Sequence, residues 1–194
     1  SKRIQNILRH PLLTALRTAH LTLEPHFDYW PGFHKVISPA YLMGYWQSER
    51  YFDNIADIIR HDFTFRRPLV GPNLALDKRI SETNSVSLHV RRGDYVSNPQ
   101  AFATHGVCSI EYYENAIKYV SERIPSPNFY VFSDDMEWVR SHLEIRHPSC
   151  YVENNNGSDS YIDMQLMSRC KHNILANSSF SWWGAWLNAN ADKL

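Results

Sequence analysis

The chain has 194 residues, which is enough for one complete domain and part of a second. Its 20 basic and 20 acidic side chains balance, so we expect no broad surface for nucleic acid, and any anion must be bound by individually placed residues. Three unevenly spaced cysteines without a Cys-x-x-Cys pair are typical of ordinary thiols in a reducing compartment.

The chain shows no leader peptide and no apolar run of about 18 residues, so neither a signal peptide nor a membrane span is predicted. It begins at Ser1 and stops at Leu194 directly after a helical pattern. We therefore expect it to be a piece of a longer protein.

Residues 1–80 are predicted to form a partial, mostly helical N-terminal region that prolines divide into short elements. The clearest helix is expected over residues 48–61, where apolar side chains recur at helical spacing. The aromatic segment 40–46 reads as a buried strand. Residues 68–85 contain Pro, Gly and Asn and are predicted to be the linker.

Residues 81–194 are predicted to form an α/β domain, a Rossmann-like parallel sheet with flanking helices that is truncated at its C-terminus. Strands alternate with helices throughout this region. The predicted strands are Val86–Val90, Asn128–Phe132, Cys150–Val152 and Asn173–Ala176, and the helices after them are Ser109–Arg123, Asp135–Leu143, Ser160–Lys171 and Phe180–Asn190. Ligands of such sheets bind at the carboxyl ends of the strands.

An arginine pair stands at the exit of the first of these strands, as Arg91 and Arg92, followed by Gly93 and Asp94. Guanidiniums match phosphate geometry, and a glycine lets a ligand approach the backbone, so the pair suits a diphosphate. Successive side chains of an extended chain point in opposite directions. One arginine is therefore expected to bind the anion while the other is held by Asp94 or braces the loop; the alternative is a surface turn.

Acidic residues follow the second strand, as Ser133, Asp134 and Asp135. Paired carboxylates can hold a divalent metal. We favour a capping box formed by Asp134 and Glu137, because an Asp cap stabilises a helix by about 1 kcal/mol. No metal site is predicted here or elsewhere, since the ten histidines lack ligand spacing.

Three serines around Phe180 precede the last helix, at positions 178, 179 and 181. Hydroxyls together with the unpaired amides of a helix start can form an anion cradle without lysine. Ser178, Ser179 and Phe180 are therefore candidate ligand-binding residues. The tryptophans further along this helix are more typical of core packing.

Two further residues have both a structural and a functional interpretation. Asp163 follows Ser160 by three positions and fits a capping box, but a carboxylate here could also accept the N1–H and exocyclic amine of guanine. His89 ends the first strand beside the arginines and could contact a base or pack within the sheet. The common ATP-binding loop, dinucleotide-binding and serine-hydrolase motifs are absent from the sequence.

With these residues in view, the chain resembles the alpha-1,2-fucosyltransferases of glycosyltransferase family 11. Three motifs carry the resemblance in order, with Gly44–Glu49 as a further similar segment. They are His-Val-Arg-Arg-Gly-Asp-Tyr at 89–95, Phe-Ser-Asp-Asp at 132–135 with Trp138, and Asn-Ser-Ser-Phe-Ser-Trp-Trp-Gly-Ala-Trp-Leu at 177–187. A Gly-x-Gly-Asn-Gln segment that opens the family's first domain is missing.

The resemblance implies the donor half of a GT-B-type enzyme, with GDP-fucose as donor, a terminal galactose as acceptor, inversion, and no metal or cofactor. It implies that Arg91 or Arg92 binds the diphosphate, that His89 and Asp163 lie near guanine, and that Ser178, Ser179 and Phe180 line the donor site. Residues 1–80 would then belong to the acceptor side. Asp94 is the nearest candidate base, although an arginine partner is its alternative role.

A chain that covers mainly the donor half is expected to be inactive by itself. The implied partners are GDP-fucose and a galactose-terminated oligosaccharide or glycolipid, with no nucleic acid. The implied location is the cytoplasm of a bacterium, with peripheral contact to the inner membrane through a lipid-linked acceptor, or the Golgi membrane in a eukaryote. The alternatives are a non-catalytic glycan-binding module, for which the 13% aromatic residues would suit, and another GDP-sugar or metal-dependent transferase.

Overall fold

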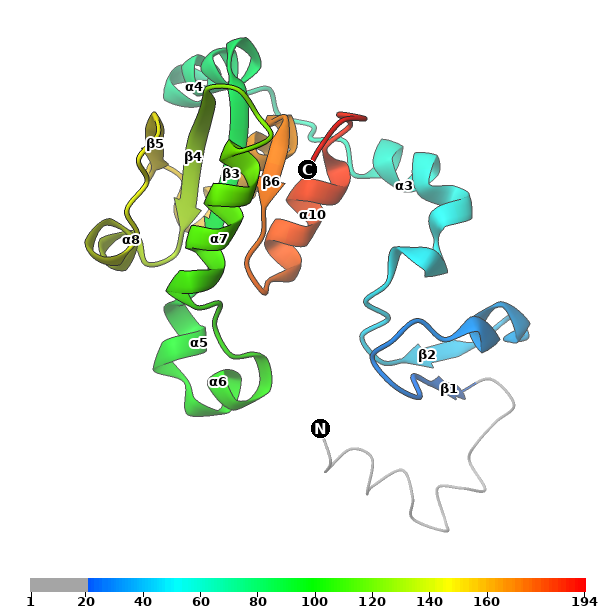
Figure 1. Cartoon of the computed structure of the whole chain (residues 1–194). Helices are drawn as coiled ribbons and strands as arrows, with labels where there is room; N and C mark the ends of the chain where they lie inside the picture. Colours follow the sequence, from blue (N-terminus) through cyan, green and yellow to red (C-terminus); the bar gives the residue numbers. More distant parts are fainter. Residues whose placement is uncertain (1–20) are drawn as a thin grey trace. The chain divides into compact units, whose positions relative to one another are not determined.

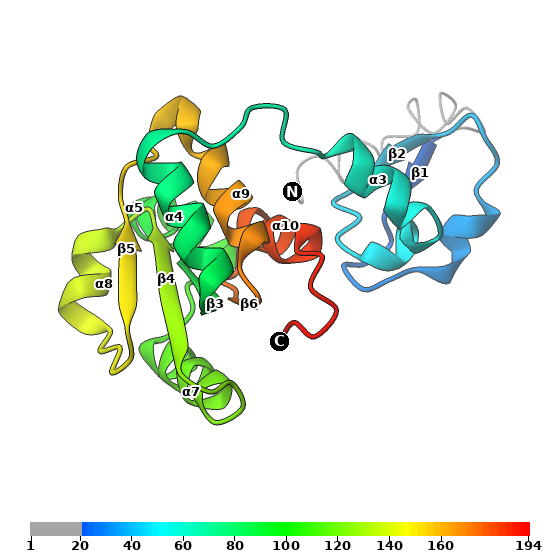
Figure 2. The same ribbon diagram turned by 90° about the horizontal axis from the view of Figure 1, so that it is seen from above.

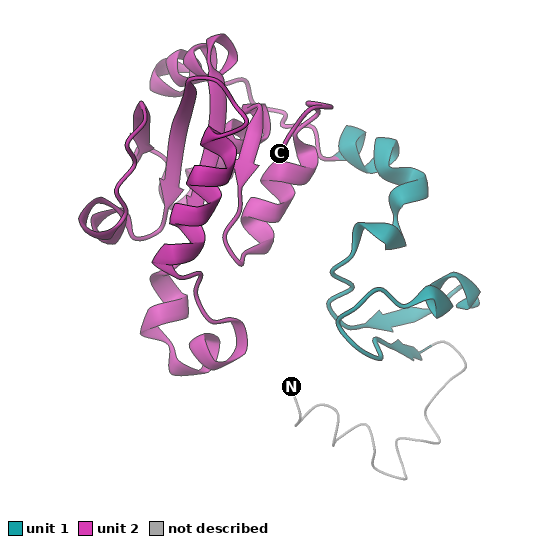
Figure 3. Ribbon diagram, viewed as in Figure 1, with its two compact units in different colours: residues 1–62 teal, residues 63–194 magenta. Residues whose placement is uncertain are grey.

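The structure is a computed structural model that describes residues 21–194. The chain divides into two compact units, residues 1–62 and residues 63–194 (Figure 3). The boundary between the two units follows residue 62, whereas the sequence analysis places it after residue 80. The part of the predicted helical region that precedes residue 21 lies outside the described residues.

The described part of the first unit combines a small sheet with short helices. Strand β1 (Leu21–Leu23) pairs in parallel with β2 (Tyr41–Met43). The 3₁₀ helices are Pro31–Lys35, Glu49–Tyr51 and Asp53–Ile55, and helix α3 covers Ala56–Asp62. The helix predicted over 48–61 is thus wrong in its first half, where two short 3₁₀ turns replace it. The strand predicted within 40–46 is present as the short β2, but its predicted burial is wrong, because Tyr41 and Leu42 are exposed.

Aromatic packing around Tyr51 holds this unit together. The ring of Tyr51 lies 4.8 Å from that of Phe33 and 5.4 Å from that of Trp46, centroid to centroid. The carboxylate of Glu24 accepts hydrogen bonds from the backbone amides of Tyr45 and Trp46, at 2.7 and 2.9 Å. These contacts fix the position of the Gly44–Glu49 segment, so this segment has a structural role in the first unit.

The second unit contains a four-stranded sheet of order β5-β4-β3-β6 in which every pair is parallel (Figure 1). The strands are β3 (Asn84–Val90), β4 (Pro127–Ser133), β5 (Ser149–Val152) and β6 (His172–Ile174). The four predicted strands are confirmed, as is the α/β class with a Rossmann-like parallel sheet. Because all four run the same way, their carboxyl ends lie at one edge of the sheet.

Helices cover both faces of this sheet (Figures 1 and 2). They are α4 (Gly71–Glu82), α5 (Gly93–Ser97), α6 (Pro99–His105), α7 (Ile110–Ser121), α8 (Met136–His142), α9 (Tyr161–Arg169) and α10 (Ser179–Leu187). Core residues of α7 and α8 pack on one face, and those of α4 and α9 pack on the other. Helix α10 packs beside α9.

Side chains of the central strands alternate between the two cores, as the period of a β-strand requires. Leu88 and Val131 belong to the core under α7 and α8, whereas Phe132 belongs to the core under α4 and α9. His89 points to the opposite face from Leu88 and is 5% exposed. The sheet therefore buries a histidine two residues before the arginine pair.

Most of the predicted linker, residues 68–85, is a helix. Residues 71–82 of the predicted linker form α4, which packs on β3 and α9. Pro72 lies in the first turn, where proline costs the helix no hydrogen bond.

Among the described residues 21–194, no helix combines the length and the apolar character needed to cross a membrane.

Candidate functional site

The exit of β3 is dominated by Arg91, which two carboxylates hold. Its Nη2 donates to Oδ1 of Asp94 over 2.7 Å, and its Nη1 lies 2.9 Å from Oδ2 of Asp134. The Arg91 side chain is 33% exposed, so its other N–H groups stay accessible to a ligand. Asp94 is the more exposed of the two carboxylates. The predicted pairing of an arginine with Asp94 is present in the structure.

Arg92 is more buried than Arg91 and has different partners. Its Nε lies 3.4 Å from Oδ2 of Asp135, and its guanidinium carbon lies 3.8 Å from the centroid of the Trp138 ring. The side chain is only 17% exposed. A guanidinium that is stacked on an indole and paired with a carboxylate is suited to bracing the loop.

Asp134 connects the exits of β3 and β4. Its carboxylate contacts the Arg91 guanidinium and also accepts from the backbone amide of Arg92 over 2.8 Å. A Cβ at Gly93 would lie 2.5 Å from Oδ2 of Asp134. Gly93 therefore makes room for the Asp134 carboxylate, a steric role that is separate from the ligand approach expected from the sequence.

The capping box predicted for α8 is wrong, and the capping box that was one of two interpretations for α9 is not formed either. Asp135, and not Asp134, is the N-cap of α8, with its carboxylate accepting from the amide of Trp138 over 3.2 Å. The side chain of Ser160 makes no capping hydrogen bond at the start of α9. Neither Asp134 nor Asp163 therefore takes part in a capping box.

His89 lies beside Phe180 and close to the arginine loop. The two rings are 5.7 Å apart between centroids, and Nδ1 of His89 is buried with no hydrogen-bond partner among the described residues. Burial lowers the pKa of His89 to about 4; the Asp134 carboxylate raises it and the Arg91 guanidinium lowers it. His89 is therefore neutral at physiological pH and can offer a ligand both a donor and an acceptor nitrogen.

The start of α10 is capped by its own serines. The Oγ of Ser178 accepts from the amide of Phe180 over 3.2 Å, and Ser181 donates to the carbonyl oxygen of Ser178 over 3.1 Å. Ser179 is exposed at the first position of the helix. The Ser178 hydroxyl is thus occupied in the cap, while Ser179 remains open to solvent.

Asp163 belongs to a cluster of amide side chains that the sequence analysis missed. Its Oδ1 accepts from Nδ2 of Asn155 over 2.7 Å, and the Asn155 amide exchanges hydrogen bonds with Asn73 at 2.7 and 3.1 Å. Burial raises the pKa of Asp163 to about 6, against the opposing effect of the Asn155 hydrogen bond. Asn73, at the start of α4, is distant in sequence, so no local motif indicates it.

Among residues 21–194, no group of three or more His, Cys, Asp and Glu side chains is arranged to hold a metal ion. The structure brings together Arg91, Asp94, Asp134 and His89, with Phe180 against the histidine. Asp163 lies in the separate asparagine cluster.

The chain is an α/β protein with a parallel sheet and a guanidinium at the carboxyl edge of that sheet, an arrangement suited to a phosphate-bearing ligand. The chain belongs to glycosyl transferase family 11, whose model matches residues 26–192. No solved structure matches the chain.

Several curated relatives support this membership. The chain is 48% identical to an alpha-1,2-colitosyltransferase of Escherichia coli over 75% of this chain and 50% of that protein. It is 42% identical to the O-antigen biosynthesis glycosyltransferase WbnK of Escherichia coli, over 79% and 52%. It is 28% identical to galactoside alpha-(1,2)-fucosyltransferase 2 of Bos taurus, over 85% and 48%. The chain thus spans about half the length of these relatives.

Proposed function

We propose that this chain supplies the donor-binding part of a glycosyltransferase that transfers fucose from GDP-fucose to the 2-hydroxyl of a terminal galactose, with inversion and without a metal. The observation that carries the proposal is the partly exposed Arg91 at the exit of β3, which lies beside the buried neutral His89. Membership of glycosyl transferase family 11 supports the reaction class. An acceptor on a lipid at a membrane surface fits the same proposal.

Arg91 is the residue that we assign to the diphosphate. The phosphate replaces Asp94, whose side chain is 58% exposed and returns to water at little cost. Asp134 keeps the guanidinium oriented during this exchange. The charge that develops on the leaving GDP is then stabilised by a preorganised donor, an effect worth several kcal/mol in a dry site. Arg92 braces the loop.

The guanine base is assigned to Asp163 and His89. A carboxylate can accept both the N1–H and the exocyclic amine of guanine, and Asn155 fixes the orientation of the Asp163 carboxylate. His89 offers a neutral imidazole next to Phe180. Ser179 and the amides at the start of α10 supply further donors for an anion. Asp94 serves in this proposal as the exchangeable partner of Arg91 and not as the base.

A colitosyl donor is the second candidate, because the chain is 48% identical to an alpha-1,2-colitosyltransferase and 28% identical to the Bos taurus fucosyltransferase. The two donors differ in the transferred sugar. Both candidates therefore share the assignments of Arg91, Asp163 and His89, and they differ in the contacts made by the transferred sugar.

Calorimetry and a transfer assay test the proposal together. We expect the chain to bind GDP and to bind ADP and UDP at least about tenfold more weakly, since a buried polar group that loses its partner costs 1–3 kcal/mol. A protein that joins this chain to the family's remaining length is then assayed with GDP-fucose or a colitosyl nucleotide and a galactose-terminated acceptor. Binding of free glycan without any binding of GDP would instead indicate a glycan-binding module and overturn the proposal.

A further inference from the structure

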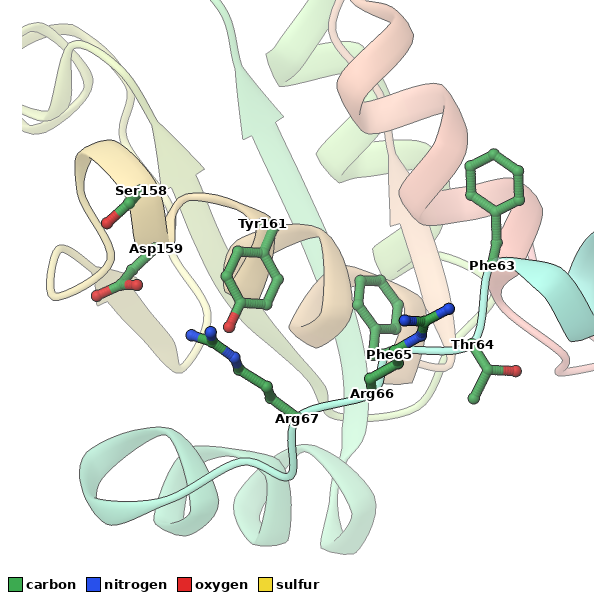
Figure 4. A pocket seen from close by; sticks show the side chains of 8 residues that line it. All are labelled: Phe63, Thr64, Phe65, Arg66, Arg67, Ser158, Asp159 and Tyr161. Atoms are coloured by element: carbon green, nitrogen blue, oxygen red, sulfur yellow. The ribbon is translucent and has the colours of Figure 1, made fainter.

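A pocket of about 600 Å³ lies in the second unit, outside the residues that the proposed function uses. Figure 4 shows it between the segment that precedes α4 and the start of α9. Its volume falls within the range of small-molecule sites. The lining residues are Phe63, Thr64, Phe65, Arg66, Arg67, Ser158, Asp159 and Tyr161.

Arg66 and Arg67 differ from the other arginines of the second unit. Neither makes a hydrogen bond, an ion pair or a ring contact with any described residue, and both are exposed. By contrast, Arg140, Arg146 and Arg169 each lie against a carboxylate. The two side chains extend to different sides of their segment in Figure 4, and each brings an unpaired positive charge to the pocket lining that an anion would neutralise.

The charge balance of the pocket contrasts with that of the arginine loop. At the exit of β3, the charges of Arg91 and Arg92 are opposed by three carboxylates, those of Asp94, Asp134 and Asp135. In the pocket lining, Asp159 is the one carboxylate against two guanidiniums. The pocket therefore has an excess of positive charge, while the loop has an excess of negative charge.

The remaining lining residues suit a ligand that carries more than a bare anion. Phe63 stacks on Trp183 of α10 with ring centroids 4.8 Å apart and planes 7° from parallel, so this wall is fixed. In Figure 4 the Arg67 side chain extends toward Tyr161 and the turn that contains Ser158 and Asp159. Hydroxyl and aromatic groups thus lie next to the cationic ones, which is typical of sites for phosphorylated small molecules.

We propose that this pocket binds a phosphate or diphosphate group through Arg66 and Arg67. The phosphate belongs either to the nucleotide-sugar donor or to a phosphate-bearing acceptor, two sources with the same recognition chemistry. The proposal goes beyond the proposed function, which assigns no role to either arginine. It rests on the pocket and its charges and not on the identity of the transferred sugar.

Titration with inorganic pyrophosphate tests the proposal by calorimetry on the 194-residue chain. We expect Arg66→Ala/Arg67→Ala to weaken pyrophosphate binding at least about tenfold, because a charge-assisted hydrogen bond contributes about 1.5–3 kcal/mol. The matched control is Arg146→Ala, since Arg146 is an exposed arginine that pairs with Glu144 outside the pocket. This control should bind pyrophosphate as the unmodified chain does.

Asp159→Asn supplies a second variant with the opposite sign. Removal of the one lining carboxylate should tighten pyrophosphate binding several-fold and make it more dependent on salt, because the net positive charge of the lining rises. This variant keeps both arginines, so it tests the site even if the double variant does not fold. No detectable pyrophosphate binding, or equal affinities in the double variant and the unmodified chain, would overturn the proposal.

Competition between GDP and pyrophosphate then identifies the source of the phosphate. If the pocket receives the donor, GDP displaces pyrophosphate and the double variant loses affinity for both. If it receives a phosphate-bearing acceptor, GDP displaces only the pyrophosphate bound at Arg91, and the double variant loses the pyrophosphate site of the pocket while it keeps its affinity for GDP. The two proposals fail in different ways. If only the proposed function is wrong, pyrophosphate binds at Arg66 and Arg67 but GDP does not bind the chain.

Discussion

Gly93 and Asp134 are in direct contact across the exits of β3 and β4, with space for a hydrogen and not for a methyl group. A Cβ at Gly93 would lie 2.5 Å from Oδ2 of Asp134. The same carboxylate holds the Arg91 guanidinium at 2.9 Å and the Arg92 amide at 2.8 Å. The orientation of Arg91, the arginine that we propose for the diphosphate, therefore depends on a glycine two residues away.

Substitution Gly93→Ala should weaken GDP binding by about tenfold and lower the free energy of unfolding by about 1–2 kcal/mol, because the Asp134 carboxylate must rotate away from its donors. Calorimetry and urea unfolding measure the two effects. Asp134→Asn is the matched control, since it keeps the shape and one acceptor oxygen but loses the charge. Unchanged GDP affinity in both variants would show that Asp134 does not position Arg91.

The two adjacent arginines should respond differently to removal. Arg91→Ala is expected to lower kcat/KM for the nucleotide sugar at least about 100-fold with little change in stability, because an exposed ion pair contributes at most about 1 kcal/mol. Arg92→Ala should lower the free energy of unfolding by about 1–2 kcal/mol, since it loses the contacts to Asp135 and Trp138.

Steady-state kinetics and thermal unfolding on both variants check this division of roles. The assay uses a protein that contains this chain and the family's remaining length. Near-normal turnover of the Arg91 variant would remove Arg91 from the diphosphate site, and a fully stable Arg92 variant would remove its bracing role.

The order and direction of the strands follow from local sequence, which is why they could be predicted. Strands β3 and β4 are β-prone segments that end at polar residues, and parallel pairing follows from the helices between the strands. Helix α4 could not be predicted in the same way. Its first turn is Gly71-Pro-Asn73, a composition typical of loops, and its burial depends on tertiary contacts with β3 and α9.

The edge where the site lies could also be predicted, as could the pairing of an arginine with Asp94, but the contacts of Asp134 and Asn155 could not. The strand-exit rule places Arg91, Asp134 and Ser178 at one edge. The preference of Asp134 for Arg91 depends on the adjacency of β3 and β4, and the contact between Asn73 and Asn155 joins residues 82 positions apart. A capping-box pattern in the sequence is short and local, so it predicted caps that tertiary contacts override.

The guanine assignment makes a prediction about nucleotide preference. Asp163→Asn should reduce the preference for GDP over inosine diphosphate, which lacks the exocyclic amine, by about tenfold, because an amide oxygen accepts more weakly than a carboxylate. Asn155→Ala should reduce it to a smaller extent by freeing the Asp163 side chain. Competition binding with both nucleotides measures the ratio, and an unchanged ratio in the Asp163 variant would place guanine elsewhere.

The raised pKa of Asp163 also predicts how stability depends on pH. Between pH 3.8 and about 6 the folded state holds a proton on Asp163 that the unfolded state has lost, so this residue makes stability fall as pH rises through that window. His89 acts with the opposite sign between about pH 4 and 6.5, where only the unfolded state is protonated, so its contribution is lost as pH falls. The two effects oppose each other in the overlapping range.

Asp163→Asn removes one side of this balance. Urea unfolding at intervals from about pH 4 to pH 6 should therefore show a steeper rise of stability with pH in this variant than in the unmodified chain. By about pH 7 the variant should be more stable by an amount on the order of 2 kcal/mol, since it no longer buries a charge. His89→Gln is the complementary variant and should show a shallower rise or a fall. Identical slopes in all three proteins would mean that neither group is buried as the structure places it.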